Sequence, residues 1–198
     1  MTRRFMLAIA LLAAMPAGAA ADPQQPQPTF DCAKVSGQVE TVICKDAGLI
    51  ALDRKMAGVY AAAMKKWPAN IASTERARQR GWIKGRNDCW KESDVRACVE
   101  ESYRTRMVEL QIGAGLVTVP KPVEFACTGG PSQPFTASYY AQTEPASAVL
   151  TFGSDKVITF ASPVASGTKY VAANVEFREH QGQVTVSWYG TSLTCRAR

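Results

Sequence analysis

The segment QGQVTVSWYGTSLTC, residues 181–195, decides the fold class of the second half of the chain. Its apolar residues Val184, Val186 and Trp188 alternate with polar ones, which is the period-two pattern of a strand with one buried face. Glycine-containing pairs, QG and YG, bound this run at both ends and indicate tight turns between short strands. The segment therefore predicts antiparallel β structure.

The same pattern extends over residues 123–198 and predicts about eight short strands, separated by further GG, GS and SG pairs. So many strands in so short a stretch would leave exposed edges in an open sheet, and closure into a small barrel removes them. Cys127 lies at the first predicted strand and Cys195 at the last. A disulfide between them would tie the ends of the barrel and stabilise it by about 4 kcal/mol in the chain-entropy model.

Residues 31–113 follow a different period. Apolar residues recur three and four positions apart between Leu49 and Trp67, which predicts an amphipathic helix with Asp46 as its N-cap and Pro68 at its end. Further helices are predicted to begin near Ser73 and Ser93, about three in all. A glycine- and proline-rich linker over 114–122 then separates this helical domain from the barrel, so the fold class is a two-domain α+β chain.

The N-terminus has the features of a secretory signal peptide over residues 1–21. Arg3 and Arg4 precede an apolar run that is too short to span a bilayer, and small residues follow before a predicted cleavage site at Asp22. Residues 22–30 are rich in proline and glutamine and read as a linker. No cysteine lies at the predicted cleavage point, so a periplasmic or secreted protein without a lipid anchor is expected.

Six cysteines in an exported chain predict three disulfides. Beside the pair at the ends of the barrel, the four early cysteines can pair in three ways. Locality favours Cys32 with Cys44 and Cys89 with Cys98. No CxxC pair or Cys/His cluster is present, so no metal site is expected.

The sequence offers little for catalysis. His180 is the single histidine, no GxSxG elbow or phosphate-binding loop occurs, and disulfide formation removes every thiol nucleophile. The net charge of +6, which includes Arg3 and Arg4, forms no basic stripe of the kind that tracks nucleic acid. We therefore expect a protein that is not an enzyme and that uses no cofactor. The four tryptophans are expected to pack in the core or at its rim.

Two loops of the β half remain as candidate contact surfaces: SGTKY, residues 166–170, and REHQG, residues 178–182. They lie on either side of a strand predicted over residues 170–177. From the pattern alone, each also fits an ordinary turn, the first because Gly167 can adopt a conformation that other residues avoid.

The β half resembles the MliC/PliC family of c-type lysozyme inhibitors. The matching features are EFAC (124–127), SYY (138–140), ASGTKY (165–170) and TC (194–195). This resemblance implies an eight-stranded antiparallel barrel that inhibits by insertion: a serine in one loop and a lysine in the next contact the catalytic carboxylates of lysozyme.

Carried over to this chain, the resemblance places Ser166 at the serine position, with Gly167, Lys169 and Tyr170 around it as further lysozyme-contacting residues. The family lysine stands fourteen positions after the serine, where this chain has His180; a small shift would offer Arg178 or Glu179 instead. An imidazole between two carboxylates is favoured in its protonated form, so histidine can serve where the family has lysine.

The helical half resembles the N-terminal domain of LprI-type lysozyme inhibitors. The matching text is FDC (30–32), ETVIC (40–44), LIALDRKM (49–56), QRGWIKGRNDC (79–89) and the spaced residues Cys98, Tyr103 and Arg106. The two resemblances together predict an exported inhibitor of c-type lysozyme, whose partner is that protein and not nucleic acid or membrane. The alternatives are a barrel that binds another envelope ligand, with His180 marking a lost inhibitory activity, and an enzyme acting on the cell wall.

Overall fold

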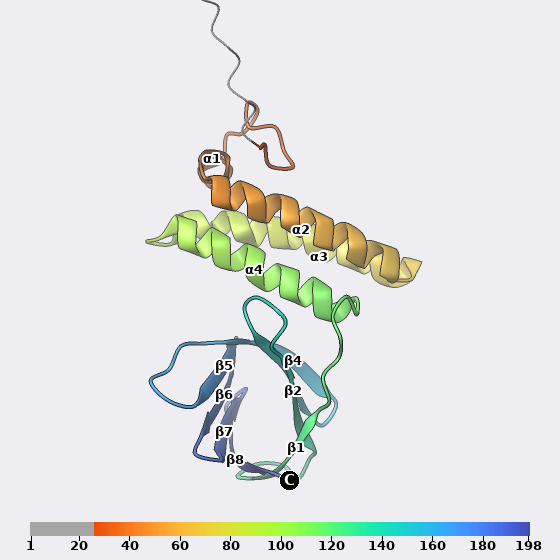
Figure 1. Cartoon of the computed structure of the whole chain (residues 1–198), viewed down its shortest axis with the longest axis vertical. Coiled ribbons are helices and arrows are strands. Elements are labelled where there is room, and N and C mark those ends of the chain that lie inside the picture. The colour runs from red at the N-terminus through yellow and green to blue at the C-terminus, as the bar shows by residue number, and fades with distance from the viewer. Residues whose placement is uncertain (1–25) are drawn as a thin grey trace, which may run out of the picture.

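The computed structural model describes residues 26–198, in which helices precede a β-barrel (Figure 1). The signal peptide predicted over residues 1–21 and the first part of the predicted linker lie outside the described residues. Within them the helices are α1 (Gln38–Lys45), α2 (Ala47–Lys66), α3 (Ala69–Asn87), the 3-10 helix η1 (Asp88–Lys91) and α4 (Val95–Gly113). The prediction of a helical half followed by an antiparallel barrel is confirmed.

Local signals set the helix ends. Asp46 caps α2 as predicted, because its carboxylate accepts a hydrogen bond of 2.9 Å from the Leu49 backbone N–H. Pro68 both follows α2 and stands at the N-cap of α3, so α3 begins at Ala69 and not near Ser73. Helix α1, with eight residues, is additional to the three predicted helices, since it is too short to display a clear period.

The helical core is apolar and is held by two disulfides. Its buried members are Val39, Ile43, Leu49, Met56, Ala63, Cys89, Val99, Tyr103, Met107 and Leu110. The disulfides join Cys32 to Cys44 and Cys89 to Cys98, which are the local pairs. Of the tryptophans expected to pack, Trp90 is an exception with 54% of its surface exposed, because the 3-10 turn that buries Cys89 directs the next side chain outward.

Eight strands form a closed antiparallel barrel in which every strand pairs with its neighbours in sequence and β1 pairs with β8. The strands are β1 (Val123–Thr128), β2 (Phe135–Tyr140), β3 (Ser147–Phe152), β4 (Asp155–Ala161), β5 (Thr168–Ala172), β6 (Val175–His180), β7 (Gln183–Trp188) and β8 (Thr191–Ala197). Cys127 and Cys195 lie directly opposite each other on β1 and β8, and their disulfide closes the seam of the barrel as predicted.

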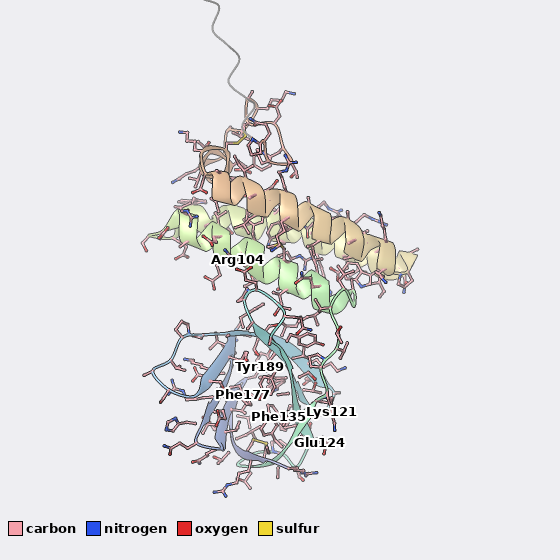
Figure 2. All side chains as sticks on the ribbon, in the orientation of Figure 1. Arg104, Lys121, Glu124, Phe135, Phe177 and Tyr189 are labelled. Carbon is pink, nitrogen blue, oxygen red and sulfur yellow. A yellow bond between two sulfur atoms is a disulfide. The ribbon has the colours of Figure 1, made fainter. Side chains whose placement is uncertain are left out.

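Aromatic side chains fill the barrel. Phe135 and Phe177 lie inside it (Figure 2) and stack with ring centroids 6.4 Å apart, while Trp188 meets Phe135 edge to face at 6.3 Å. Such edge and offset contacts add to the free energy gained by burying the rings. The rigid interior fixes where each strand ends and therefore where each loop begins.

The helical half sits over one side of the barrel, with α4 the helix nearest to it (Figure 1). Arg104 on α4 forms an ion pair of 2.6 Å with Glu144 in the loop between β2 and β3. In the same loop, Gln142 donates a hydrogen bond of 2.7 Å to the carbonyl of Thr118 in the linker. These contacts hold the barrel against α4.

Candidate functional site

The two predicted contact loops meet at one end of the barrel. Residues 170–177 are not a single strand, as the sequence predicted, but contain the end of β5, a two-residue turn and the start of β6. Asn174, with a φ of 60°, makes the reversal possible, since asparagine tolerates the left-handed region better than most residues. Because two strands and not one separate the loops, both loops emerge on the same side.

Ser166 and His180 contact each other at this end. The Ser166 hydroxyl oxygen lies 3.4 Å from Nδ1 of His180, and both residues are exposed. The contact follows from the register of the hairpin, in which Thr168 stands opposite Glu179. We call Ser166, Gly167 and His180 the plug.

Gly167 is what allows the two loops to touch. Its φ of 75° is left-handed, and a Cβ at this position would lie 2.0 Å from the carbonyl oxygen of Glu179 and 3.3 Å from Cα of His180. The first separation is shorter than any real Cβ contact, so no other residue fits without moving the backbone. Glycine therefore sets the spacing of the plug.

Tyr170 lies beneath the loop and not on its tip. Its ring packs against Tyr139 at 5.6 Å and Phe177 at 6.3 Å between centroids, which places it against the barrel core. Burial raises the pKa of the Tyr170 and Tyr139 phenols, so both remain neutral at physiological pH. Tyr170 thus supports the loop that carries Ser166.

The other polar side chains of this hairpin have partners of their own. Lys169 forms an ion pair of 2.9 Å with Glu176, which also lies 3.9 Å from Arg178. The carboxylate of Glu179 accepts a hydrogen bond of 2.9 Å from the Gly182 backbone N–H in the following turn. Of the residues considered for the position of the family lysine, His180 is therefore the one that meets Ser166.

Comparison with known proteins bears on both halves of the chain. Residues 125–194 match the MliC family, described as membrane-bound lysozyme-inhibitor of c-type lysozyme. Over 170 residues the chain is 34% identical to Lipoprotein LprI of Mycobacterium bovis and, in equal measure, of Mycobacterium tuberculosis; the match covers 85% of this chain and 83% of each relative. The chain belongs to the LprI family. No solved structure matches it significantly.

Both predicted resemblances are thus confirmed, and the LprI-like motifs of the helical half prove to be structural. Asp53 and Arg86 are only 2% and 5% exposed, and the Tyr103 hydroxyl lies between them, donating to Asp53 at 2.7 Å and accepting from Arg86 at 2.7 Å. Thr29 donates to the other oxygen of the same carboxylate through its backbone N–H and its hydroxyl. Burial raises the pKa of Tyr103 far above its usual range, which keeps the phenolic proton in place.

A second buried cluster includes the motif residues Gln79 and Arg106. Arg106, 6% exposed, contacts Glu75 at 3.2 Å and donates to the side-chain oxygen of Gln79 at 3.1 Å. No buried side-chain nitrogen or oxygen in residues 26–198 lacks a hydrogen-bond partner. These buried charges are therefore satisfied by partners within the fold, as expected for buried ions.

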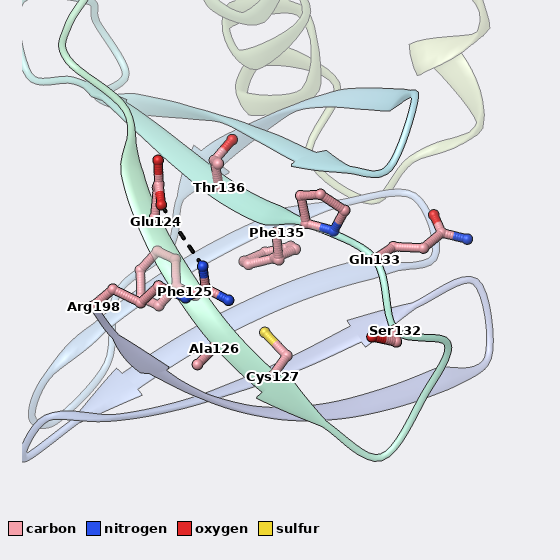
Figure 3. A pocket seen from close by; sticks show the side chains of 10 residues that line it. Glu124, Phe125, Ala126, Cys127, Ser132, Gln133, Phe135, Thr136 and Arg198 are labelled. Atoms are coloured by element: carbon pink, nitrogen blue, oxygen red, sulfur yellow. Dashed lines mark ion pairs between the residues drawn. The ribbon is translucent and has the colours of Figure 1, made fainter.

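The LprI-family barrel has a hollow between β1 and β2, of about 500 Å³, where the two strands separate beyond Phe125 and Phe135 (Figure 3). It lies across the barrel from β5 and β6 and so cannot include the plug. Within the described residues, no three His, Cys, Asp or Glu side chains gather to hold a metal ion. No helix between residues 26 and 198 is long and apolar enough to cross a membrane.

One feature of the site escaped the sequence prediction. The sequence predicts a strand across Ala173 and Asn174, because the apolar residues on both sides continue an uninterrupted pattern, whereas the structure has a turn there. Asn174 is the sequence signal for this turn, since asparagine is common in tight turns.

Proposed function

We propose that this protein is an exported inhibitor of c-type lysozyme that places Ser166 and His180 in the catalytic cleft of the enzyme. The observation that carries the proposal is the exposed contact between these two side chains at one end of an MliC-like barrel. The relatives carry the name of a lipoprotein, and the MliC family is described as an inhibitor of c-type lysozyme. The MliC description supports a role in binding a protein.

The chemistry of the plug suits the chemistry of the target. The lysozyme cleft holds the two carboxyl groups that hydrolyse the glycosidic bond, one kept protonated and the other ionised. A serine hydroxyl can donate to the ionised oxygen and accept from the protonated one. The imidazole ring of His180 presents Nε2 on the side opposite to the Nδ1 that faces Ser166. In its protonated form this ring gives a charge-assisted hydrogen bond in a poorly solvated cleft.

Export and domain organisation are part of the proposal. A signal peptide over residues 1–21 would be removed before Asp22, and the linker over 22–30 would lead into the helical domain over 31–113. The barrel over 123–198 would then act in the periplasm or outside the cell. Absence of a lipid anchor stays a prediction.

The test is inhibition of a c-type lysozyme by the full-length protein and its variants. His180→Ala removes a charge-assisted hydrogen bond of about 1.5–3 kcal/mol, which corresponds to roughly a 10- to 150-fold weaker inhibition. Ser166→Ala removes the hydrogen bond that the hydroxyl donates to the ionised carboxylate, which is also charge-assisted, and is expected to weaken inhibition by a similar factor, roughly 10- to 150-fold. Ser154→Ala, an exposed serine in the turn between β3 and β4 at the other end of the barrel, is the matched control. Full potency of both plug variants would refute the assignment.

The pH dependence separates histidine from the family lysine. If imidazolium is the inhibitory form, inhibition weakens above neutral pH, while His180→Lys keeps its potency there. The lysine variant also controls for titration of lysozyme itself, because both proteins meet the same enzyme. Hydrolysis of peptidoglycan by the purified protein alone would instead indicate an enzyme.

A further inference from the structure

A groove of about 770 Å³ lies between α4 and the outer face of the barrel at β4 and β5. Its helix wall is formed by α4, the helix nearest to the barrel in Figure 1. Arg104, labelled on α4 in Figure 2, lines the groove and forms the ion pair with Glu144 described above. The groove is distinct from the plug, and its two walls differ in chemistry.

The barrel wall of the groove is apolar, although it is on the outside of the barrel. Strand β4 directs Thr159 into the core, where it is fully buried, and therefore directs Ile158 and Phe160 outward. Phe160 pairs with Val171 on β5, so the outward apolar surface continues onto the next strand. All three outward side chains line the groove and remain partly exposed. Outward positions of a small barrel are usually polar, and an apolar stripe there is typical of an interaction surface.

The helix wall of the groove carries three carboxylates, Glu100, Glu101 and Glu109, beside Arg104. Glu100 is paired with Arg96 and Arg104, and Glu109 is paired with Arg106 at 2.9 Å. Glu101 is exposed and forms no ion pair among residues 26–198. Glu101 is therefore the carboxylate of this wall that is available to a basic side chain of a partner.

The groove is continuous with the plug. Ser162 and Pro163 line the groove and begin the loop that carries Ser166. Three residues span at most about 11 Å, so the rim of the groove is no farther than that from Ser166. A standard interface covers about 800 Å² on each partner, equivalent to a disc with a radius of about 16 Å. A partner centred on the plug therefore reaches the groove.

The groove also bears on the electrostatic attraction of a basic partner, which the barrel by itself does not provide. C-type lysozymes are basic proteins, but the barrel over residues 123–198 has nearly equal numbers of acidic and basic side chains, and the plug hairpin pairs its own charges. The unpaired carboxylate that would attract a basic side chain of the enzyme, Glu101, comes from α4 in the helical half. This gives the helical domain a part in recognition.

We propose that the groove is a second contact for the same lysozyme, in which Glu101 of α4 receives a basic side chain of the enzyme and the stripe of Ile158, Phe160 and Val171 receives apolar surface beside it. The inference rests on the proposed function, since it takes lysozyme as the partner. It assigns the helical domain to affinity and association rate, and leaves inhibition to the plug.

The test is binding of the full-length protein to a c-type lysozyme, with association and dissociation rates measured at several salt concentrations. Glu101→Lys is expected to weaken binding about 3- to 10-fold, mainly through slower association, and to flatten the dependence on salt. Glu124→Lys is the matched control, because Glu124 is exposed on β1 across the barrel and the change in net charge is identical. Glu124→Lys is expected to weaken binding to lysozyme less than Glu101→Lys does.

The plug variants separate this inference from the proposed function. The double variant Ser166→Ala/His180→Ala should lose inhibition yet keep weak, salt-sensitive binding that Glu101→Lys then removes. If wild-type protein inhibits lysozyme while Glu101→Lys and Glu124→Lys behave alike, the groove is not a contact and the proposed function stands. If wild-type protein neither binds nor inhibits, the proposed function fails. A dimer in sedimentation that Glu101→Lys dissociates, with lysozyme binding unchanged, would assign the groove to a second copy and overturn the inference.

Discussion

Replacing Gly167 with alanine tests whether the spacing of the plug matters. The new Cβ would lie 2.0 Å from the carbonyl oxygen of Glu179, so that the loop or the end of β6 must move by about 1 Å to restore an ordinary contact. A left-handed φ costs a residue with a Cβ about 1–2 kcal/mol in addition. The free variant relieves this strain by moving Ser166 away from His180, and binding must then restore the strained geometry. We therefore expect inhibition to weaken at least about 5- to 30-fold.

The assay is a titration of lysozyme activity with Gly167→Ala and with Gly190→Ala. Gly190 has a φ of 91° in the turn between β7 and β8, at the opposite end of the barrel, and a Cβ there meets nothing within 4 Å. The control thus carries the same conformational cost without the collision and far from the plug. Thermal unfolding of both variants separates loss of the site from loss of the fold. Equal inhibition by Gly167→Ala and wild-type protein would refute the claim that glycine sets the spacing.

Two further predictions concern stability. Replacing Cys127 and Cys195 with alanine removes a link between residues 68 apart and should lower the free energy of unfolding by about 4 kcal/mol. The same replacement at Cys89 and Cys98, which are nine apart, should lower it by about 3 kcal/mol. Chemical unfolding measures both losses, and a smaller loss for the Cys127–Cys195 pair would contradict the entropic account. Asp46→Ala removes the cap of α2 and should cost about 1 kcal/mol at neutral pH. The hydrogen bond from the Leu49 N–H, followed by the contact with Arg96, lowers the pKa of Asp46. The stability that the cap contributes is therefore present above the ordinary pKa of aspartate and is lost as the pH falls through the lowered pKa. A stability difference between Asp46→Ala and wild type that persists in acid would contradict this.

The resemblance to the MliC family predicts a lysine where this chain has His180. His180 lies against Ser166, with 3.4 Å between Nδ1 and the hydroxyl oxygen, so the two groups are presented together.

Much of the fold follows from short-range patterns. Period-two alternation with glycine turns predicted the barrel, spacings of three and four predicted the long helices, and an even number of cysteines predicted three disulfides, of which the local pairs formed. Each of these signals resides in neighbouring residues, because backbone period, caps and turns depend on local geometry. The family motifs also predict Ser166 and His180 as contact residues.

Only the tertiary structure decided that these two residues meet. Each antiparallel strand reverses the direction of the chain, so the side on which a loop emerges depends on the number of strands that precede it. One strand over residues 170–177 would have placed Ser166 and His180 at opposite ends of the barrel, and the reversal at Asn174 places them 3.4 Å apart. The groove beside α4 likewise arises where segments distant in sequence are packed together. Identity and spacing of residues are properties of the sequence, whereas proximity depends on the closure of the barrel and on how the helical half rests against it.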